Sequence, residues 1–349
     1  MVETKAWRGR DWIAPEIEYT REEWETVLDC AAQIKRNYAV GEVPKLLENK
    51  TLFMMFYNRS LRTRNSFEVG MTQLGGHAIN LAPKEIYTPA LEGEEIPYTT
   101  ERVSDVARVL SGMGDAIGIR IYGKPTGWIY GKGEDYIREF AKWSSIPLIN
   151  MEDDVFHPCQ LAADLLTLKE FLGGNLKGKK FVMSWAYSGS AEKPLAIPQS
   201  AVLGTTLFGM DVVLAHPKGF ELDKKITDKA KEYADLHGGS FEVSYDMKEA
   251  FDEADAVYPK SWGALSCVPP KTTKPRLDRM TELFNKNKNW ICDQELMDRT
   301  NRAIYMHCLP ADRGMEVTDE IIDGKRSVVW QEAWNRLHVQ KGILSLLLR

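Results

Sequence analysis

The sequence predicts an α/β protein with two doubly wound parallel-sheet domains. Short apolar runs alternate with amphipathic stretches along the whole chain, which is the pattern of strands and helices in parallel sheets. A length of 349 residues suggests two domains, at roughly 150 residues each. We expect the domains over 1–150 and 151–330, with a C-terminal helix, 331–349, that packs back on the first domain.

This alternation places each element. In the first domain we expect strands at 51–57, 77–81, 115–120 and 146–150, and helices near 21–36, 101–112 and 134–143 and directly after residue 64. In the second we expect strands at 179–185, 211–216, 241–244, 255–258, 303–306 and 327–330. Its helices are expected near 158–173, 195–209 and 221–236, and the C-terminal helix near 331–348. The segments 82–99, 121–133, 186–199 and 263–276 fit neither pattern, and structureless loops of that length tend to be functional.

Composition narrows the class of protein. The net charge of −5 means that the field of the whole molecule does not attract nucleic acid, so any anion site must be local. No run reaches the roughly 18 apolar residues of a membrane span, and the first residues do not read as a signal peptide. The five cysteines are scattered and lack CxxC pairs, which favours reduced thiols in the cytoplasm over disulfides or a zinc site.

The segment SLRTR, residues 60–64, predicts a phosphate site. It follows an apolar strand and opens a helix, whose first amides have no internal partners and carry the positive end of the helix dipole. The hydroxyls of Ser60 and Thr63 and the guanidinium of Arg62 can surround phosphate oxygens beside these amides. Taken alone, the segment fits a capped helix with a solvated basic start about equally well.

The segment HPCQ, residues 157–160, lies between the apolar run IPLIN and an apolar helix. Pro158 suits a first helical position, so His157 is expected at a helix start and at the carboxyl end of a parallel strand. There its imidazole can donate a hydrogen bond to a carbonyl oxygen, with Gln160 one turn further on. In isolation, His157 would more often be a helix cap.

The segment HCLP, residues 307–310, ends the strand AIYM in a similar way. Pro310 favours an extended turn before it, which leaves backbone carbonyls facing outward. Cys308 in such a position is more often a buried small hydrophobe than a reactive thiol.

SLRTR, HPCQ and HCLP in this order resemble the family of aspartate and ornithine carbamoyltransferases, and the resemblance covers nearly the whole chain, including GGHAINL and NRLHVQKGIL. It implies a carbamoyl-phosphate-binding domain first and an amine-substrate-binding domain second. It also implies a cytoplasmic homotrimer with shared active sites at subunit junctions, acting in amino-acid metabolism such as arginine biosynthesis. No metal, organic cofactor, nucleic acid or membrane is expected as a partner.

The family's roles transfer to matching positions of this chain. The expected carbamoyl-phosphate site comprises Ser60, Leu61, Arg62, Thr63, Arg120, His157, Gln160, Cys308, Leu309 and Arg336. Within it, the resemblance assigns catalytic roles to Arg62, Arg120, His157, Cys308 and Arg336. His157 would polarise the carbonyl and Gln160 would hold the carbamoyl nitrogen. The backbone carbonyls of Cys308 and Leu309 would orient the attacking amine.

The stretch VYPKSWG, residues 257–263, bears on the amine substrate. Ornithine enzymes of the family carry an aspartate four residues before Ser-Met-Gly, which grips the free α-amino group. Here Val257 takes that position and Lys260 adds a cation, so a buried ammonium would lack its partner. We therefore expect a carbamoyl acceptor that is ornithine-like and N-acylated, or that lacks the α-amino group, with Lys260 free to bind a carboxylate. Alternatively, Lys260 is a solvated loop charge.

KSWG is similar to the N-acetylornithine carbamoyltransferases, and SWAYSGSAEKPLAIPQ to knotted family members of uncertain substrate. The amine site is therefore expected to include Ser261 and Trp262, with Tyr87 reaching it from a neighbouring subunit's 82–99 loop. The resemblance also predicts a trefoil knot in the second domain, made by the proline-containing loop 189–199. Two departures are Glu316, where the acetylornithine enzymes carry a lysine, and Trp334, where a glutamate is usual.

The expected reaction moves a carbamoyl group from carbamoyl phosphate to a side-chain amine, giving a citrulline-type product and phosphate. Three alternatives stay open: an ornithine carbamoyltransferase, an enzyme that works in reverse on a ureido acid, and an inactive anion-binding paralogue. A dinucleotide-binding dehydrogenase is disfavoured because no GxGxxG follows a strand.

Overall fold

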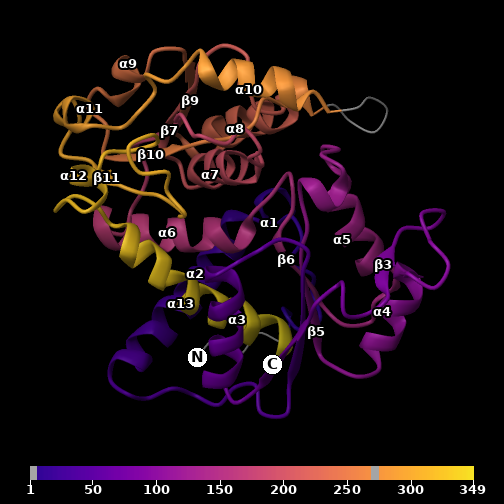
Figure 1. Ribbon diagram of the computed structural model, residues 1–349. Helices are drawn as coiled ribbons and strands as arrows, with labels where there is room; N and C mark the ends of the chain where they lie inside the picture. The colour runs from indigo at the N-terminus through magenta and orange to yellow at the C-terminus, as the bar shows by residue number, and fades with distance from the viewer. Residues whose placement is uncertain (1–5, 269–274) are drawn as a thin grey trace. The chain divides into compact units, whose positions relative to one another are not determined.

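The computed structural model describes residues 6–268 and 275–349, and they form two compact units, drawn together in Figure 1. Unit 1 comprises Met1–Thr126, Gly131–Ala162 and Arg336–Arg349; unit 2 comprises Gly127–Tyr130 and Ala163–Asn335. The chain passes from one unit to the other within α6 (Pro158–Leu172) and within α13 (Val329–Leu348). The expected division of function between domains 1–150 and 151–330 stays a prediction.

A four-stranded parallel sheet forms the centre of unit 1, with the strand order β2-β1-β5-β6. The strands are β1 (Thr51–Phe56), β2 (His77–Leu81), β5 (Ala116–Arg120) and β6 (Leu148–Glu152). Because β2 pairs on one side of β1 and β5 on the other, the winding reverses beside β1. Parallel strands of this kind read as nearly continuous apolar runs, which is how the sequence revealed them.

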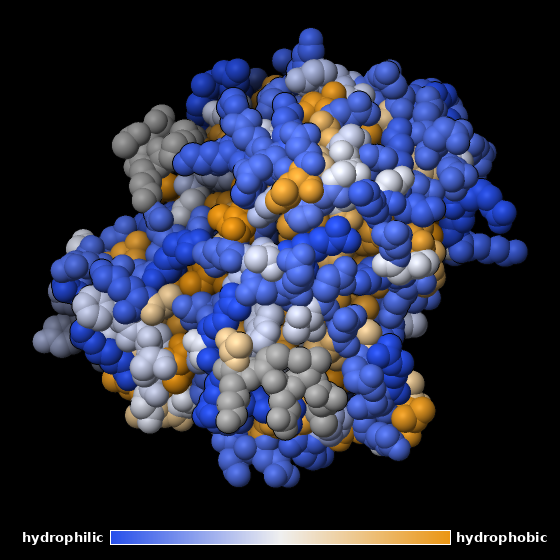
Figure 2. Space-filling model, turned by 180° about the vertical axis from the view of Figure 1, so that it is seen from behind, coloured by the Kyte–Doolittle hydropathy of each residue, from blue (hydrophilic) through white to orange (hydrophobic). Residues whose placement is uncertain are grey.

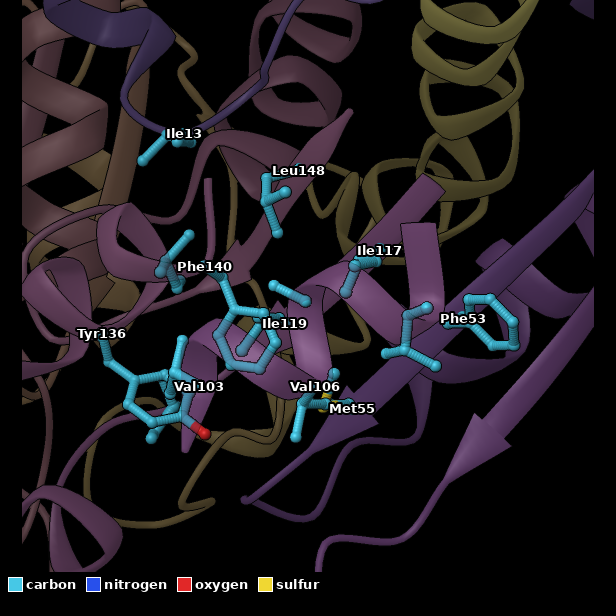
Figure 3. Packing of buried hydrophobic residues seen from close by; sticks show 14 residues of the cluster. Ile13, Phe53, Met55, Val103, Val106, Ile117, Ile119, Tyr136, Phe140 and Leu148 are labelled. Atoms are coloured by element: carbon cyan, nitrogen blue, oxygen red, sulfur yellow. The ribbon is translucent and has the colours of Figure 1, made fainter. Parts of the chain in front are cut away.

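Helices complete unit 1. They are α1 (Pro15–Glu18), α2 (Arg21–Ala39), α3 (Arg62–Gln73), α4 (Val103–Ser111), the short η1 (Lys124–Thr126) and α5 (Lys132–Trp143). A capping box of Thr20 and Glu23 starts α2. Figure 3 shows the core that results: Phe53, Ile117 and Leu148 of the sheet pack with Val106 of α4 and Phe140 of α5.

Unit 2 contains a five-stranded parallel sheet with the order β11-β10-β7-β8-β9. The strands are β7 (Lys180–Trp185), β8 (Asp211–Ala215), β9 (Ser240–Ser244), β10 (Ala256–Lys260) and β11 (Ile304–Tyr305). The winding reverses beside β7, which pairs with β8 on one side and β10 on the other. The helices are α7 (Ala196–Leu207), α8 (Lys224–His237), α9 (Met247–Phe251), η2 (Leu265–Cys267), α10 (Leu277–Asn285), α11 (Gln294–Asp298) and α12 (Asp319–Ile322).

The expected α/β fold with parallel sheets is confirmed, but one expected strand is wrong. Residues 327–330 were expected to be extended, whereas α13 begins at Val329 and Ser327 forms only an isolated bridge to Tyr305. A short apolar run cannot distinguish a strand from the start of a buried helix, and here helical packing decides. The irregular segment 82–99 contains one strand that was not expected, β3 (Thr88–Ala90), paired with β4 (Thr100–Arg102).

The loop that leaves β7 makes backbone contacts with the end of β10. The amide of Ala186 donates to the carbonyl of Lys260 (3.2 Å), and that of Gly263 donates to the carbonyl of Lys193 (3.1 Å). A methyl group on Gly263 would lie 2.8 Å from that Lys193 oxygen, so only glycine allows this close approach. The 186–199 loop and the KSWG segment are therefore packed backbone to backbone.

The surface carries isolated exposed hydrophobic residues. The view in Figure 2 shows a face where hydrophilic residues predominate and hydrophobic ones are scattered. Tyr98 is almost fully exposed, and Leu61 is 71% exposed. Within the described parts of the chain, no helix has the length and apolar character needed to cross a membrane.

Candidate functional site

The start of α3 is a set of hydrogen-bond donors at the carboxyl end of β1. The first bond of the helix runs from the amide of Asn65 to the carbonyl of Leu61, so the amides of residues 62–64 precede the helical ladder. No side chain caps this end of the helix. Ser60 is half-buried and Thr63 is buried, so two hydroxyls accompany these amides. The positive end of the helix dipole and the unsatisfied amides favour an anion at this position.

Arg336 of α13 fixes two of the expected residues in unit 1. Its Nη2 donates to the hydroxyl oxygen of Thr63 (2.7 Å), and its Nη1 donates to Oε1 of Gln160 (2.5 Å). The side chain is buried, being 2% exposed. A single guanidinium thus holds the start of α3 beside the start of α6. This pair of hydrogen bonds joins residues 273 and 176 positions apart in the chain.

Arg120 and His157 meet at a buried carboxylate, Glu152. Arg120 ends β5 and forms an ion pair with Glu152, the last residue of β6. Nε2 of His157 lies 3.3 Å from the same carboxylate oxygen of Glu152, and both side chains are 5% exposed. Arg120 also donates to the hydroxyl of Tyr122 (3.0 Å). Glu152 therefore orients both the guanidinium and the imidazole.

Three guanidinium groups act on the imidazole of His157. Its pKa is well below 6.5, first because the ring is buried and then because Arg336, Arg120 and Arg62 are positively charged and close. His157 is therefore neutral at physiological pH. Unit 1 thus combines the helix start, three cations, one carboxylate and a neutral imidazole, an arrangement suited to a phosphate dianion and a polarisable carbonyl.

In unit 2, Lys260 forms a buried ion pair with Glu316. Nζ of Lys260 donates to Oε1 of Glu316 (2.9 Å), and the amide of Ser261 donates to the same oxygen (2.8 Å). The other oxygen of Glu316 accepts from the amide of Asp312 (2.7 Å) and lies 3.3 Å from Nε2 of His307. Lys260 is thus buried and paired, which contradicts its interpretation as a solvated loop charge, whereas its role toward a substrate carboxylate stays a prediction.

The HCLP turn is held by the ring of His307. Nδ1 of His307 accepts from the amide of Leu309 (2.9 Å), so in the neutral ring the hydrogen lies on Nε2, facing Glu316. The amide of His307 donates to Glu332, a carboxylate whose pKa is raised well above 4.5 by burial and by Asp164. Leu309 has a φ of 57°, not the extended conformation expected before proline, because its amide closes this turn.

Three more of the expected site residues are Trp262, Tyr87 and Cys308. The indole of Trp262 is fully buried and donates to the carbonyl of Phe220 (2.9 Å), and the place of Trp262 in the amine site stays a prediction. Its carbonyl accepts from the indole of Trp185. Tyr87 is exposed on the segment that contains β3, and its role toward a neighbouring subunit stays a prediction. Cys308 is buried, as expected for a small hydrophobe.

Sequence reasoning missed the two carboxylates that organise these clusters. Glu152 is the last residue of a buried strand and lies five residues before His157. A charged residue at the end of a buried strand needs a partner, and this signal could have identified Glu152 as part of the site. Glu316 was noticed as a departure from relatives but not as the partner of Lys260. A buried lysine requires a compensating charge, yet nothing local to residue 260 says which carboxylate supplies it.

Two family models match the chain. The model for the carbamoyl-phosphate-binding domain of aspartate/ornithine carbamoyltransferases matches residues 13–170, and that for the aspartate/ornithine-binding domain matches residues 186–347. The chain belongs to the aspartate/ornithine carbamoyltransferase family. It is an enzyme of the carbamoyltransferase class, and the resemblance stated from SLRTR, HPCQ and HCLP is confirmed.

Relatives in this carbamoyltransferase family include both substrate types. The N-acetylornithine carbamoyltransferase of Xanthomonas campestris pv. campestris is 38% identical over 342 residues, 95% of each chain. The ornithine carbamoyltransferase of Pyrococcus horikoshii is also 38% identical, over 98% of this chain and 96% of its own. An acetylornithine transcarbamylase complexed with acetylcitrulline superposes with a TM-score of 0.89, at 35% identity over 97% of this chain and 99% of its own.

A variant of N-acetyl-L-ornithine transcarbamylase complexed with carbamyl phosphate and N-succinyl-L-norvaline gives the same TM-score of 0.89, at 35% identity over 97% of this chain and 99% of that one. Overall identity therefore does not separate N-acetylornithine from ornithine enzymes for this carbamoyltransferase. The amine substrate must be argued from individual residues.

We expect the His157 ring to stay neutral from pH 8 down to below pH 6. Nuclear magnetic resonance of the ring carbons, assigned with His157→Asn, should show no titration across the range where an ordinary histidine titrates, at about 6.5. Because the folded pKa is lowered, the unfolded state binds the proton first, so this residue's contribution to stability is present above about pH 6.5 and lost as pH falls toward the folded pKa. A midpoint near 6.5 for His157 would contradict the description of the ring as buried among cations.

Proposed function

We propose that this carbamoyltransferase moves the carbamoyl group of carbamoyl phosphate to the side-chain amine of an ornithine-like amino acid, with an N-acylated ornithine preferred. The products are a citrulline-type ureido acid and phosphate. The observation that carries the proposal is the cluster in unit 1, where Arg62, Arg120 and Arg336 act on a neutral, buried His157. Solved relatives bound to carbamyl phosphate and to acetylcitrulline support both the donor and the product class.

In this proposal the phosphate binds at the start of α3. Ser60, Arg62 and Thr63, with the amide of Leu61, provide hydroxyl, guanidinium and amide donors to its oxygens. The phosphate is also the leaving group, so cations that stabilise its charge favour bond breaking as well as binding.

The carbonyl of the carbamoyl group is polarised by His157 and Arg120. A neutral amine adds to the carbonyl carbon, negative charge develops on the oxygen, and the C–O bond to phosphate breaks. A neutral imidazole suits this role because it donates a hydrogen bond without adding another cation to be desolvated. Oε1 of Gln160, held by Arg336, accepts from the carbamoyl NH2 group. Positioning by these contacts and by the HCLP carbonyls of Cys308 and Leu309 supplies a large part of the rate.

Preference for an acylated α-nitrogen follows from charge. Val257 is fully buried in β10, so this position offers no carboxylate to a free α-ammonium. Glu316 is the nearby candidate, but its carboxylate already accepts from Lys260 and from two amides. An α-ammonium would therefore meet no uncommitted anion among the residues of this cluster. Unpaired buried charges are penalised heavily, so free ornithine should be the poorer substrate.

One specific observation favours the alternative of an ornithine carbamoyltransferase. Glu316 stands where the acetylornithine enzymes have a lysine, and its carboxylate lies in the same cluster as Lys260. The reverse reaction on a ureido acid uses the same contacts and is the second alternative. A cytoplasmic homotrimer with shared active sites, in which Tyr87 serves a neighbouring subunit, is part of the proposal and is supported by family membership.

We also propose that unit 2 contains a trefoil knot. The support is the backbone contact of Gly263 with Lys193, together with Pro194, which stiffens the loop between β7 and α7. Such a loop can hold an opening through which the segment around KSWG passes.

Replacing Arg62 should weaken carbamoyl-phosphate binding. Arg62→Ala removes a charge-assisted contact from the phosphate, so affinity measured by calorimetry and turnover should each fall by at least about 100-fold, on the order of 3 kcal/mol. Arg36→Ala, an exposed arginine on α2, removes the same charge and should change neither. Unchanged carbamoyl-phosphate affinity in Arg62→Ala would rule out the phosphate site at α3.

The wild-type enzyme should use N-acetylornithine with a kcat/KM at least about 100-fold above that for ornithine, because the free α-ammonium finds no partner carboxylate. Initial rates with both amines at saturating carbamoyl phosphate measure this ratio. Faster turnover of ornithine at equal concentration would replace the proposal with the ornithine alternative. The exchange Val257→Asp with Lys260→Val should move preference toward ornithine, although it leaves Glu316 without its ammonium partner.

Pulling the protein from both termini in optical tweezers should leave a tightened knot. The contour length gained on complete unfolding should therefore fall short of that of an open chain of the same number of residues. A full-length extension would show that the chain is unknotted.

A further inference from the structure

The carboxylate of Glu316 joins three segments of unit 2 that are far apart in the sequence. One oxygen accepts from Nζ of Lys260 and the amide of Ser261, at the end of β10. The other accepts from the amide of Asp312 and faces Nε2 of His307 at 3.3 Å. Glu316 is fully buried, and the Lys260 side chain is 10% exposed. Each carboxylate oxygen thus has two donors, so the acceptor capacity of Glu316 is used within the protein.

Both members of the ion pair are charged. Burial alone would raise the pKa of Glu316, but Lys260 and His307 outweigh burial and hold this pKa well below 4.5. Burial would likewise lower the pKa of Lys260, and Glu316 reverses this, so that the pKa is raised above 10.5. The pair therefore presents a net charge of zero while keeping the N–H donors of an ammonium.

Donors remain at this position. An ammonium has three N–H groups, and one of those of Lys260 is directed at Glu316. The hydroxyl of Ser261, whose residue is 2% exposed, has no hydrogen-bond partner within the described residues. A buried hydroxyl without a partner is costly, so a ligand that accepts from it would be stabilised.

We propose that Glu316 determines the specificity of the amine site: by neutralising Lys260, it makes the Lys260–Ser261 donors select an uncharged carbonyl oxygen over a carboxylate. This inference rests on the proposed function and deepens it, because an acyl or amide carbonyl is such an acceptor. A substrate carboxylate at the same place would lie close to the fixed negative charge of Glu316. An amide oxygen accepts the same hydrogen bonds without that repulsion.

Two amines of equal length test this directly. 6-Aminohexanamide and 6-aminohexanoate differ only in an amide against a carboxylate, and both place their carbonyl carbon as far from the reactive amine as the acyl carbonyl of an N-acylornithine. The wild-type kcat/KM ratio, amide over carboxylate, should exceed about tenfold. In Glu316→Gln the ratio should fall by at least tenfold, because Lys260 becomes an uncompensated cation. In Lys260→Gln it should rise, because Glu316 becomes an uncompensated anion.

The ratio separates specificity from damage to the fold. A purely structural loss in either variant would lower kcat/KM for both amines together and leave their ratio unchanged, which would overturn the proposal. Glu282→Gln, an exposed glutamate on α10, removes the same charge and should keep the wild-type ratio. KM for carbamoyl phosphate should stay unchanged in all three variants.

A binding readout makes the test independent of turnover. Hexanamide and hexanoate, which lack the reactive amine, are titrated calorimetrically into enzyme saturated with carbamoyl phosphate. The same opposite shifts in their affinity ratio are expected for Glu316→Gln and Lys260→Gln. If no amine is carbamoylated yet these shifts appear, the proposed reaction fails and the specificity inference stands. If carbamoylation proceeds and the ratios do not move, the inference alone fails.

Discussion

The reversal of strand order in each parallel sheet is the constraint on which the rest of the molecule depends. In unit 1 the chain winds from β1 to β2 and then continues on the other side at β5; in unit 2 it winds outward from β7 and returns at β10. At such a reversal the loops leaving neighbouring strands turn to opposite faces of the sheet, and space opens outside the carboxyl ends. In unit 1, Ser60 follows β1 and Arg120 ends β5; in unit 2, the loop 186–195 follows β7 and Lys260 ends β10.

The two clusters treat charge in opposite ways. In unit 1, Glu152 compensates one cation, but three arginines act on His157, so a surplus of positive charge is left for an anion. In unit 2, Glu316 balances the charge of Lys260, so the pair keeps N–H donors but has no net charge. Buried charges are costly unless they are paired. The cluster in unit 1, with its surplus of positive charge, is therefore the one that favours a negatively charged ligand.

Much of this could be read from the sequence. The strands, most of the long helices and the uncapped start of α3 follow from local apolar periodicity and from motifs that carry their own geometry. The partners of the buried charges could not be predicted from the sequence, because Lys260 and Glu316 are 56 positions apart and only the folded sheet brings them together. The direction of the Trp262 indole could not be predicted for the same reason, because its hydrogen-bond partner Phe220 is 42 positions away in the sequence. Residues 327–330 were misjudged because a four-residue apolar run has no distinguishing period.

The position of Arg336 has a consequence for how the protein acquires activity during synthesis. This arginine bonds Thr63 and Gln160, yet it is translated 176 residues after the second of them. A chain that ends before α13 lacks both of these hydrogen bonds and one of the three guanidinium groups that act on His157. The start of α3 and the start of α6 therefore gain their shared partner only when the last helix is made.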